Sequence, residues 1–139
     1  MKYKIIFLCT GNSARSQMAE GLLKHLAGDR FEVFSAGIKP TKLNPLAEKV
    51  MAEIGIDISK QKSKSVKGFL YNQFDCVITV CDNARESCPF FSGKYKKIHW
   101  NLQDPASVHG TEKEKLLVFR EIRNKIRKNI TRFLTSYNF

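Results

Sequence analysis

Hydrophobic and polar positions follow two different patterns along the chain. Short apolar runs rich in Ile, Val and Phe predict four β-strands, at residues 3–8, 31–35, 75–80 and 97–100. Apolar residues at spacings of three and four predict three helices, at residues 15–27, 45–54 and 111–133. Strands that alternate with helices are typical of an α/β domain with a parallel sheet. We therefore expect a single three-layer domain over residues 1–139, with a four-stranded parallel sheet flanked by helices.

Residue types at the predicted helix ends support these boundaries. Asn44 is a favourable N-cap, and Pro45 suits the first helical position. Gly55 suits a helix end, and Thr111 and Glu114 have the spacing of a capping box. We expect the helices to bury Met18, Leu22, Leu23 and Leu26, then Ala47, Val50, Met51 and Ile54, and finally Leu116, Phe119, Ile122, Ile126, Ile130 and Phe133.

The first predicted strand leads straight into the segment Cys9-Thr10-Gly11-Asn12-Ser13-Ala14-Arg15-Ser16. A strand that turns sharply into a helix leaves backbone N–H groups unpaired, and such a loop attracts a small oxyanion. We expect Gly11 to supply a position that tolerates φ > 0, and Arg15 to bind two oxygens of a tetrahedral anion. The same field favours the thiolate of Cys9, to which Ser16 is well placed to donate a hydrogen bond. The segment predicts covalent chemistry on a phosphate-like ion.

These residues also have plain structural interpretations. A free cysteine such as Cys9 is often a small hydrophobic residue of a buried strand. Arg15 could be a solvated helix residue, and serine favours helix starts without any catalytic role. A cysteine followed six positions later by arginine, with a glycine between them and a strand-to-helix switch around them, is much less often accidental. We therefore favour the functional interpretation.

Two further cysteines flank a segment that follows the strand predicted at 75–80. Cys81 ends this strand, so it should lie at the same carboxyl edge of the sheet as Cys9, where ligands of open α/β sheets bind. If residues 82–88 are helical, a rise of about 1.5 Å per residue separates the Cα atoms of Cys81 and Cys88 by about 10 Å. A disulfide needs less than about 7 Å, so pairing would require the segment to unwind.

Other roles for the thiols and for one acidic residue remain open. One or both of Cys81 and Cys88 could be incidental, but three cysteines at one sheet edge favour a thiol relay. We expect no zinc or other metal, because the chain has no CxxC and no His at ligand spacing. Cys76 lies inside the apolar strand and is expected to fill core volume. Asp104 precedes Pro105 and could act as a general acid, although Asp-Pro pairs are common in turns.

Composition and charge limit the kinds of partner that the protein can have. Hydrophobic residues at 42% and charged residues at 27% are ordinary for a globular protein, whereas the net charge of +11 implies an anionic partner. No apolar run approaches the roughly 18 residues needed to span a bilayer, and the N-terminal run is too short for a signal peptide. We expect a cytoplasmic protein with no membrane partner, in which four cysteines point to redox or catalytic work.

Together these residues resemble the thioredoxin-coupled arsenate reductases, a branch of the low-molecular-weight protein tyrosine phosphatase superfamily. The resemblance covers nearly the whole chain and implies the low-molecular-weight phosphatase-like fold. Ala106 fits the reductase branch, because phosphatases of the superfamily commonly have an aromatic residue after their Asp-Pro. The matching segments are 9–21, 35–37, Asn44-Pro45, 55–59, Cys81 with Cys88-Pro89, His99-Trp100 and Asp104-Pro105-Ala106.

The resemblance implies a reaction sequence for the cysteines. Cys9 attacks arsenate held by the loop, from Thr10 to Ser16, while Asp104 protonates the departing hydroxyl. Cys81 then attacks the adduct, arsenite leaves and a Cys9–Cys81 disulfide forms. Cys88 resolves that bond, and thioredoxin, as the external reductant, reduces the resulting Cys81–Cys88 disulfide. We expect no bound cofactor, and we expect a monomer.

One position departs from the family pattern. Family members with a potassium site use an Asn, a Glu and a Ser that match Asn12, Glu20 and Ser35, together with an Asp where this chain carries Lys64. A lysine there would repel the cation, or its ammonium would take the cation's place. We therefore expect a degenerate site and no potassium dependence.

Two other functions are alternatives. The first is hydrolysis of phosphomonoesters or phosphotyrosine by Cys9, Arg15 and Asp104 alone, with Cys81 and Cys88 dispensable. The second is a nucleic-acid-binding module, which the positive charge suggests. We do not expect nucleic acid as a partner, because no helix-turn-helix, RNA-binding aromatic pair or zinc module accompanies the charges. The basic residues concerned are Lys60, Lys62, Lys64 and Lys67, with Arg120, Arg123, Arg127, Lys128 and Arg132 on the last helix.

Overall fold

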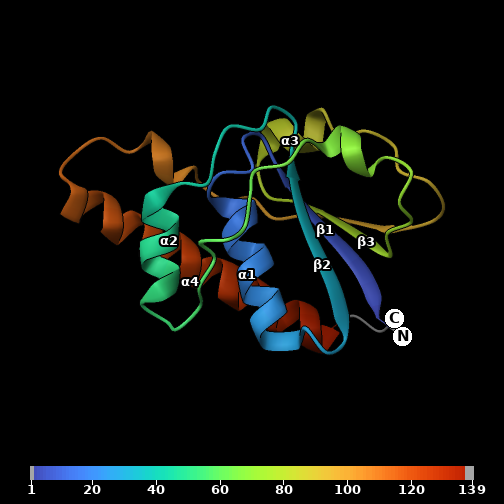
Figure 1. The fold of residues 1–139 in the computed structure, drawn as a ribbon, viewed down its shortest axis with the longest axis horizontal. Coiled ribbons are helices and arrows are strands. Elements are labelled where there is room, and N and C mark those ends of the chain that lie inside the picture. Colours follow the sequence, from blue (N-terminus) through green and yellow to red (C-terminus); the bar gives the residue numbers. More distant parts are fainter. Residues whose placement is uncertain (1, 137–139) are drawn as a thin grey trace.

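A four-stranded parallel sheet forms the centre of the protein. The computed structural model describes residues 2–136. The strands lie in the order β2-β1-β3-β4, and every neighbouring pair is parallel, as the alternating pattern predicted (Figure 1). Their bounds are β1 Tyr3–Cys9, β2 Phe31–Gly37, β3 Cys76–Thr79 and β4 Lys96–His99. Because all four strands run the same way, their carboxyl ends meet at one edge of the sheet.

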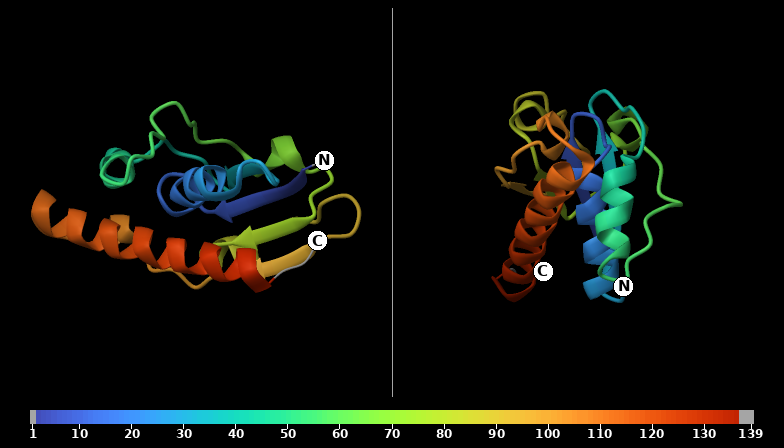
Figure 2. Two further views of the ribbon diagram at one scale, coloured as in Figure 1. Left: turned by 90° about the horizontal axis from the view of Figure 1, so that it is seen from below. Right: turned by 90° about the vertical axis from the view of Figure 1, so that its left-hand side faces the viewer.

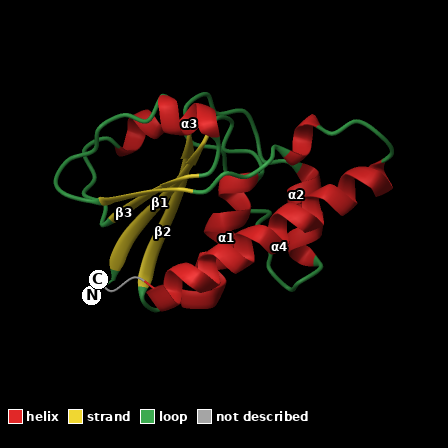
Figure 3. Ribbon diagram, turned by 180° about the vertical axis from the view of Figure 1, so that it is seen from behind, coloured by secondary structure: helices red, strands yellow, loops and turns green. Residues whose placement is uncertain are grey.

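Three longer helices gather on the same side of the sheet (Figure 3). Helix α1 contacts β1 and β2, and the long α4 runs past both α1 and α2 (Figure 2). A five-residue helix, α3, lies over the carboxyl ends of the strands (Figure 1). The helices are α1 Arg15–Ala27, α2 Pro45–Ala52, α3 Asp82–Glu86 and α4 Glu112–Ser136, with 3-10 helices η1 Val66–Phe69 and η2 Pro105–Ser107.

The other face of the sheet is covered mainly by aromatic side chains. Phe34 of β2 packs edge-on against Phe69 of η1 and against Phe74, and Phe74 in turn packs edge-on against Phe91. These rings join the 66–74 segment to the chain that follows α3. The loops that carry the chemistry are therefore anchored to a rigid core.

Helix capping agrees with the sequence patterns. The side chain of Asn44 accepts a hydrogen bond from the Leu46 N–H, and Pro45 is the first residue of α2. Thr111 Oγ1 accepts from the Glu114 N–H while the Glu114 carboxylate accepts from the Thr111 N–H, so the capping box is confirmed.

Several expected boundaries and one expected core residue differ. Strand β2 extends two residues further than expected, to Gly37, because it pairs with β1 along its whole length. The prediction that Leu26 is buried is wrong, since this side chain is 39% exposed. The buried stripe of α1 passes from Leu23 to Ala27, one turn apart, which leaves Leu26 on the solvent side. Leu116 and Ile54 are only partly buried and pack against the core.

Within residues 2–136, none of the helices combines the length and apolarity that crossing a membrane requires.

Candidate active site

A tight loop carries the end of β1 into the start of α1. Cys9 is the last residue of β1, Arg15 is the first of α1, and residues 10–14 turn the chain between them. Asn12 has φ +47°, whereas Gly11 is not among the residues with positive φ. The expectation that Gly11 supplies this position is therefore wrong. Asparagine tolerates the left-handed region, and here its side chain is held by several hydrogen bonds.

The loop also requires a small residue on the neighbouring strand. A Cβ atom on Gly37 would lie 2.7 Å from the Thr10 carbonyl oxygen and 2.9 Å from the Asn12 nitrogen. Both distances are too short for any side chain, so Gly37 lets the loop lie against β2. The Ile38 and Lys39 N–H groups then bind the carbonyls of Cys9 and Thr10, which fixes the loop in place.

Cys9 is almost completely buried and lies among hydrogen-bond donors. Its Sγ atom lies 2.8 Å from Ser16 Oγ and accepts a hydrogen bond of 3.2 Å from the Asn12 N–H. A sulfur that accepts two such bonds is stabilised as the thiolate, the nucleophilic form. Ser16 itself accepts a hydrogen bond from Asn12 Nδ2, so its hydroxyl hydrogen is available to the thiolate.

A cavity of about 260 Å³ opens above this loop. Its lining residues are Cys9, Thr10, Gly11, Ser13, Ala14, Arg15, Thr41, Asp104 and Ala106. Asn12 and Ser16 are not among these residues and contact Cys9 Sγ, through the Asn12 N–H and Ser16 Oγ; that they take part in binding the anion stays a prediction. The volume is ample for a single tetrahedral oxyanion.

Arg15 and Asp104 meet at the mouth of the cavity. Arg15 Nη1 donates to the Leu102 carbonyl at 3.0 Å, and Nη2 lies 4.0 Å from Asp104 Oδ1. Asp104 caps η2 by accepting from the Ala106 N–H, and its side chain is about half exposed. The segment 102–104 thus orients the guanidinium, and the Asp104 side chain lines the cavity and is also open to solvent.

Cys81 lies next to the same loop. It precedes α3, and its Sγ atom accepts from the Ala84 N–H and lies 3.4 Å from Thr10 Oγ1. Thr10 is adjacent to Cys9 and also lines the cavity. The expectation that Cys9 and Cys81 lie at one sheet edge therefore agrees with this arrangement.

Cys88 lies two residues past the end of α3 and is half-buried. Its thiol donates to the Pro89 carbonyl, and burial raises its pKa above the ordinary value. All four cysteines are free, and the helix between Cys81 and Cys88 is formed. Cys76 lies inside the core, where burial raises its pKa to about 12.

Comparison with known proteins matches this geometry to a family. Residues 4–138 match low molecular weight phosphotyrosine protein phosphatase. The chain belongs to this family. Within it, curated relatives place the chain with the arsenate reductases. The arsenate reductase of Halalkalibacterium halodurans is 48% identical over 132 residues, 95% of each chain, and that of Bacillus subtilis is 47% identical over 134 residues, 96% of each.

Solved structures agree with this placement. An arsenate reductase in the phosphate binding state has a TM-score of 0.84 at 33% identity. The match covers 99% of this chain and 100% of the reductase chain. A thioredoxin-dependent arsenate reductase from Corynebacterium glutamicum has a TM-score of 0.67 at 29% identity, covering 98% of this chain and 64% of its own. A tyrosine phosphatase from Erwinia amylovora shares the fold, with a TM-score of 0.78 at 17% identity.

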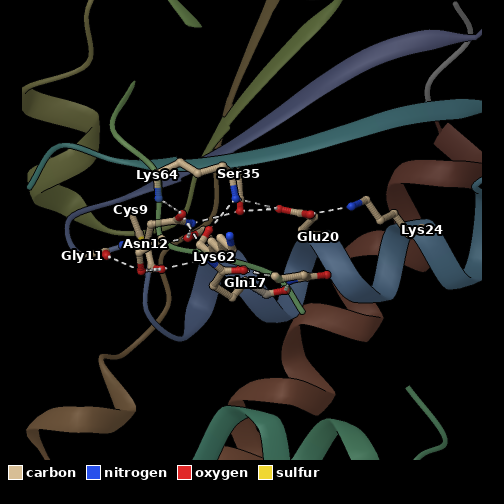
Figure 4. Close-up of polar contacts among 12 residues, drawn as sticks. Cys9, Gly11, Asn12, Gln17, Glu20, Lys24, Ser35, Lys62 and Lys64 are labelled. Carbon is tan, nitrogen blue, oxygen red and sulfur yellow. Dashed lines mark hydrogen bonds and ion pairs between the residues drawn. The ribbon is translucent and has the colours of Figure 1, made fainter. Parts of the chain in front are cut away.

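A buried polar network lies behind the loop (Figure 4). Asn12 Nδ2 donates to Ser35 Oγ, Ser35 Oγ donates to Glu20 Oε1, and Glu20 Oε2 accepts from Lys24. Lys64 Nζ lies 3.7 Å from Glu20 Oε1 and donates to the Lys62 carbonyl. The carboxylate of Glu20 is therefore compensated by two ammonium groups.

These residues do not fit a potassium ion. Asn12 Oδ1 already accepts from the Lys64 N–H and from Gln17 Nε2, and Ser35 Oγ accepts from Asn12 Nδ2. A cation beside Glu20 would have to displace the Lys64 ammonium. Across residues 2–136, no three His, Cys, Asp or Glu side chains form a group that could hold a metal ion.

Sequence reasoning missed several supporting residues. Gln17 is fully buried and bonds to Asn12 and to the Lys62 carbonyl, which ties the loop to residues 61–64. Its position on the buried face of α1 was a readable signal, because a polar residue there must have partners. Thr41 lines the cavity but carried no signal in the sequence, since only the fold brings its loop to Gly11.

Proposed function

We propose that the protein reduces arsenate to arsenite, with Cys9 as the nucleophile and Cys81 and Cys88 as the redox pair. One observation carries this proposal: a second thiol, Cys81, lies 3.4 Å from Thr10 Oγ1, beside the nucleophile and the oxyanion cavity. A phosphatase needs no such thiol, whereas a reductase needs a sulfur that can attack the first adduct. Names of relatives at 47–48% identity support the same activity.

The first step is substitution at arsenic. Arsenate binds to the loop N–H groups and to the Arg15 guanidinium, which are fixed before it arrives. The Cys9 thiolate forms an S–As bond, and one As–O bond breaks as Asp104 delivers a proton and the hydroxyl leaves as water. Arsenic is still As(V) at this point, because sulfur has only replaced oxygen.

Reduction occurs in the second step. The Cys81 thiolate attacks the Cys9 sulfur, an S–S bond forms, and the electron pair of the S–As bond goes to arsenic. Arsenic becomes As(III) and leaves as arsenite, while two thiolates have become one Cys9–Cys81 disulfide. Cys88 then attacks Cys81 by thiol–disulfide exchange, which frees the Cys9 thiolate for another cycle.

The exchange requires α3 to open. The helix Asp82–Glu86 lies between Cys81 and Cys88 and keeps the two thiols from pairing, because a disulfide requires Cα atoms less than about 7 Å apart. Burial also raises the pKa of Cys88, so this thiol is a poor nucleophile until the segment moves. Both effects slow the attack of Cys88 on Cys81 while α3 is formed.

The surface beside Cys88 supports a protein reductant, which we propose to be thioredoxin. Phe90 and Tyr71 are 92% and 91% exposed, and the Ser92 N–H bonds to the Leu70 carbonyl, so the two aromatic residues stand on neighbouring segments. Exposed aromatic side chains next to a reactive sulfur are typical anchors of a protein contact. The Corynebacterium glutamicum neighbour is named as thioredoxin-dependent.

The decisive experiment is thiol mapping after a single turnover with arsenate and no reductant. We expect a Cys81–Cys88 disulfide in the natural chain and a Cys9–Cys81 disulfide in Cys88→Ser. Cys9→Ser should form neither and make no arsenite, and Cys76→Ala is the matched control that should behave as the natural chain. Sustained turnover by Cys88→Ser with thioredoxin would contradict the relay.

Hydrolysis of phosphomonoesters is a second candidate, because Cys9, Arg15 and Asp104 share one cavity and the family is a phosphatase family. The assay is p-nitrophenyl phosphate hydrolysis by the Cys81→Ser/Cys88→Ser variant. Weak activity that survives this change is compatible with reductase function, since phosphate and arsenate share geometry. Strong hydrolysis without arsenate reduction would favour the phosphatase.

We further propose that the protein acts as a cytoplasmic monomer and that its net charge of +11 steers arsenate or an acidic reductant toward the loop. Sedimentation should give the mass of one chain, and the arsenate association rate should fall as salt rises. Salt-dependent retention on immobilised DNA or RNA would instead point to a nucleic-acid partner.

A further inference from the structure

A side-chain contact joins the start of α3 to the end of β4. His99 Nε2 lies 3.1 Å from Asp82 Oδ1, and His99 Nδ1 lies 2.8 Å from Thr79 Oγ1. Asp82 is the first residue of α3, directly after Cys81, while His99 and Thr79 are the last residues of β4 and β3. The imidazole is thus held by the sheet and in turn holds the helix that separates Cys81 from Cys88.

We propose that His99 is a positioning residue that keeps α3 wound through Asp82, so that Cys81 stays beside Thr10 until the relay needs it. Release of Asp82 then lets the segment unwind and bring Cys81 to Cys88. The stabilisation of α3 by the His99–Asp82 contact is a property of the fold, whereas its consequence for the disulfide exchange rests on the proposed function.

Both ring nitrogens of His99 are used by this contact. The Asp82 carboxylate offers only acceptors, so Nε2 donates to it. Nδ1 lies 2.8 Å from the Thr79 hydroxyl, which also lies 3.4 Å from the Ile98 carbonyl. The end of the sheet therefore orients the imidazole, and a hydrogen bond to a carboxylate is stronger than one between neutral groups.

The surrounding charges limit the size of the effect. The other titratable side chains of the three elements are Arg85 and Glu86 on α3, Lys96 and Lys97 on β4, and Cys76 on β3. Of these, Arg85 pairs with Asp82 at 3.6 Å. The Asp82 side chain is 61% exposed and that of His99 17%, so the pair is partly screened by solvent.

Hydrogen exchange of the α3 amides tests directly whether the His99–Asp82 contact stabilises the helix. The probes are the Arg85 and Ser87 N–H groups, which bond to the carbonyls of Cys81 and Asn83. Asp82→Asn replaces the carboxylate with a weaker, neutral acceptor and should lower their protection about two- to five-fold. Arg85→Gln, which removes the exposed partner of the same carboxylate, is the control and should change protection little.

Two histidine variants separate positioning from a merely structural role. His99→Ala should lower protection as Asp82→Asn does. His99→Gln keeps a neutral donor toward Asp82, so it should restore protection. Protection that is unchanged in Asp82→Asn, or that is lost equally in His99→Gln and His99→Ala, would overturn the proposal.

The rate of Cys81–Cys88 disulfide formation after one arsenate turnover tests the consequence. We expect Asp82→Asn to form this disulfide about two- to five-fold faster than the natural chain, with Arg85→Gln unchanged. If protection of α3 falls but the Cys81–Cys88 disulfide does not form faster, the positioning role is overturned and the arsenate chemistry is unaffected. Absence of any arsenate-dependent disulfide in the natural chain would contradict the proposed function. The hydrogen-exchange result would still support the stabilisation of α3 by His99.

Discussion

The ammonium of Lys64 lies 3.7 Å from a carboxylate oxygen of Glu20, a residue that is only 4% exposed. Desolvation by burial lowers the pKa of Lys64, and the Glu20 carboxylate opposes that shift. Glu20 connects through Ser35 to Asn12, whose N–H donates to the Cys9 sulfur. A covalently attached cation therefore supports the back of the catalytic loop.

The first prediction concerns potassium. Arsenate reduction by the natural chain should be the same in sodium and potassium buffers, because the Lys64 ammonium stands beside Glu20. Lys64→Asp replaces this cation with a carboxylate, so its activity should fall about tenfold without potassium and recover when potassium is added. Steady-state rates in matched salts measure this. Lys62→Asp, a charge reversal in the same loop, should gain no potassium response; such a response in Lys62→Asp would point to a general salt effect.

The second prediction concerns the nucleophile. Ser16→Ala removes a hydroxyl 2.8 Å from Cys9 Sγ, so we expect kcat/KM for arsenate to fall about tenfold. The rate at which iodoacetate alkylates Cys9 should fall in parallel, because the sulfur loses a hydrogen-bond partner. Ser136→Ala, at the exposed end of α4, serves as the control. An unchanged alkylation rate in Ser16→Ala would show that the hydroxyl does not stabilise the thiolate.

The third prediction separates the cysteines by their surroundings. Burial raises the pKa of Cys76 to about 12, so iodoacetamide at pH 8 should label it last, and only as the protein unfolds. Cys76→Val keeps an apolar side chain of similar size and should retain arsenate reduction within about twofold. Mass spectrometry of the labelled peptides and initial rates give both results. Early labelling of Cys76 would be inconsistent with its place in the core.

The fourth prediction concerns acid stability. The hydrogen bonds from Arg120, then those from Arg123, lower the pKa of Glu53, which joins α2 to α4. A carboxyl whose pKa is lower when folded stabilises the protein above its unfolded pKa, and this contribution disappears as the pH falls through the folded value. Because the side chain is over a third exposed, Glu53→Gln should lower the free energy of unfolding by only about 0.5–1 kcal/mol at pH 7.

Urea unfolding at several pH values measures this difference. The natural chain and Glu53→Gln should converge as the pH falls below the lowered pKa of Glu53, where both side chains are neutral. Glu121→Gln, on the exposed face of α4, is the control and should change stability little at either pH. A difference that persists in acid would assign the effect to packing rather than to charge.

The sequence by itself determined the order of the elements, the capping of α2 and α4, and the loop between Cys9 and Ser16. These features depend on hydrogen bonds and apolar periods within a few residues, which a linear pattern contains. The positive φ fell on Asn12 rather than Gly11 because the buried network holds the asparagine side chain, and that network is assembled from distant segments.

Only the tertiary structure decided which charges and donors meet. Lys64 reaches Glu20 because the loop after α2 folds back along α1, and His99 reaches Asp82 because β3 and β4 end side by side. The exposure of Leu26 was decided in the same way, by which face of α1 packs on the core. Parallel strands bring residues that are far apart in the chain to one edge, and pairings made there depend on the register of the sheet rather than on any local pattern.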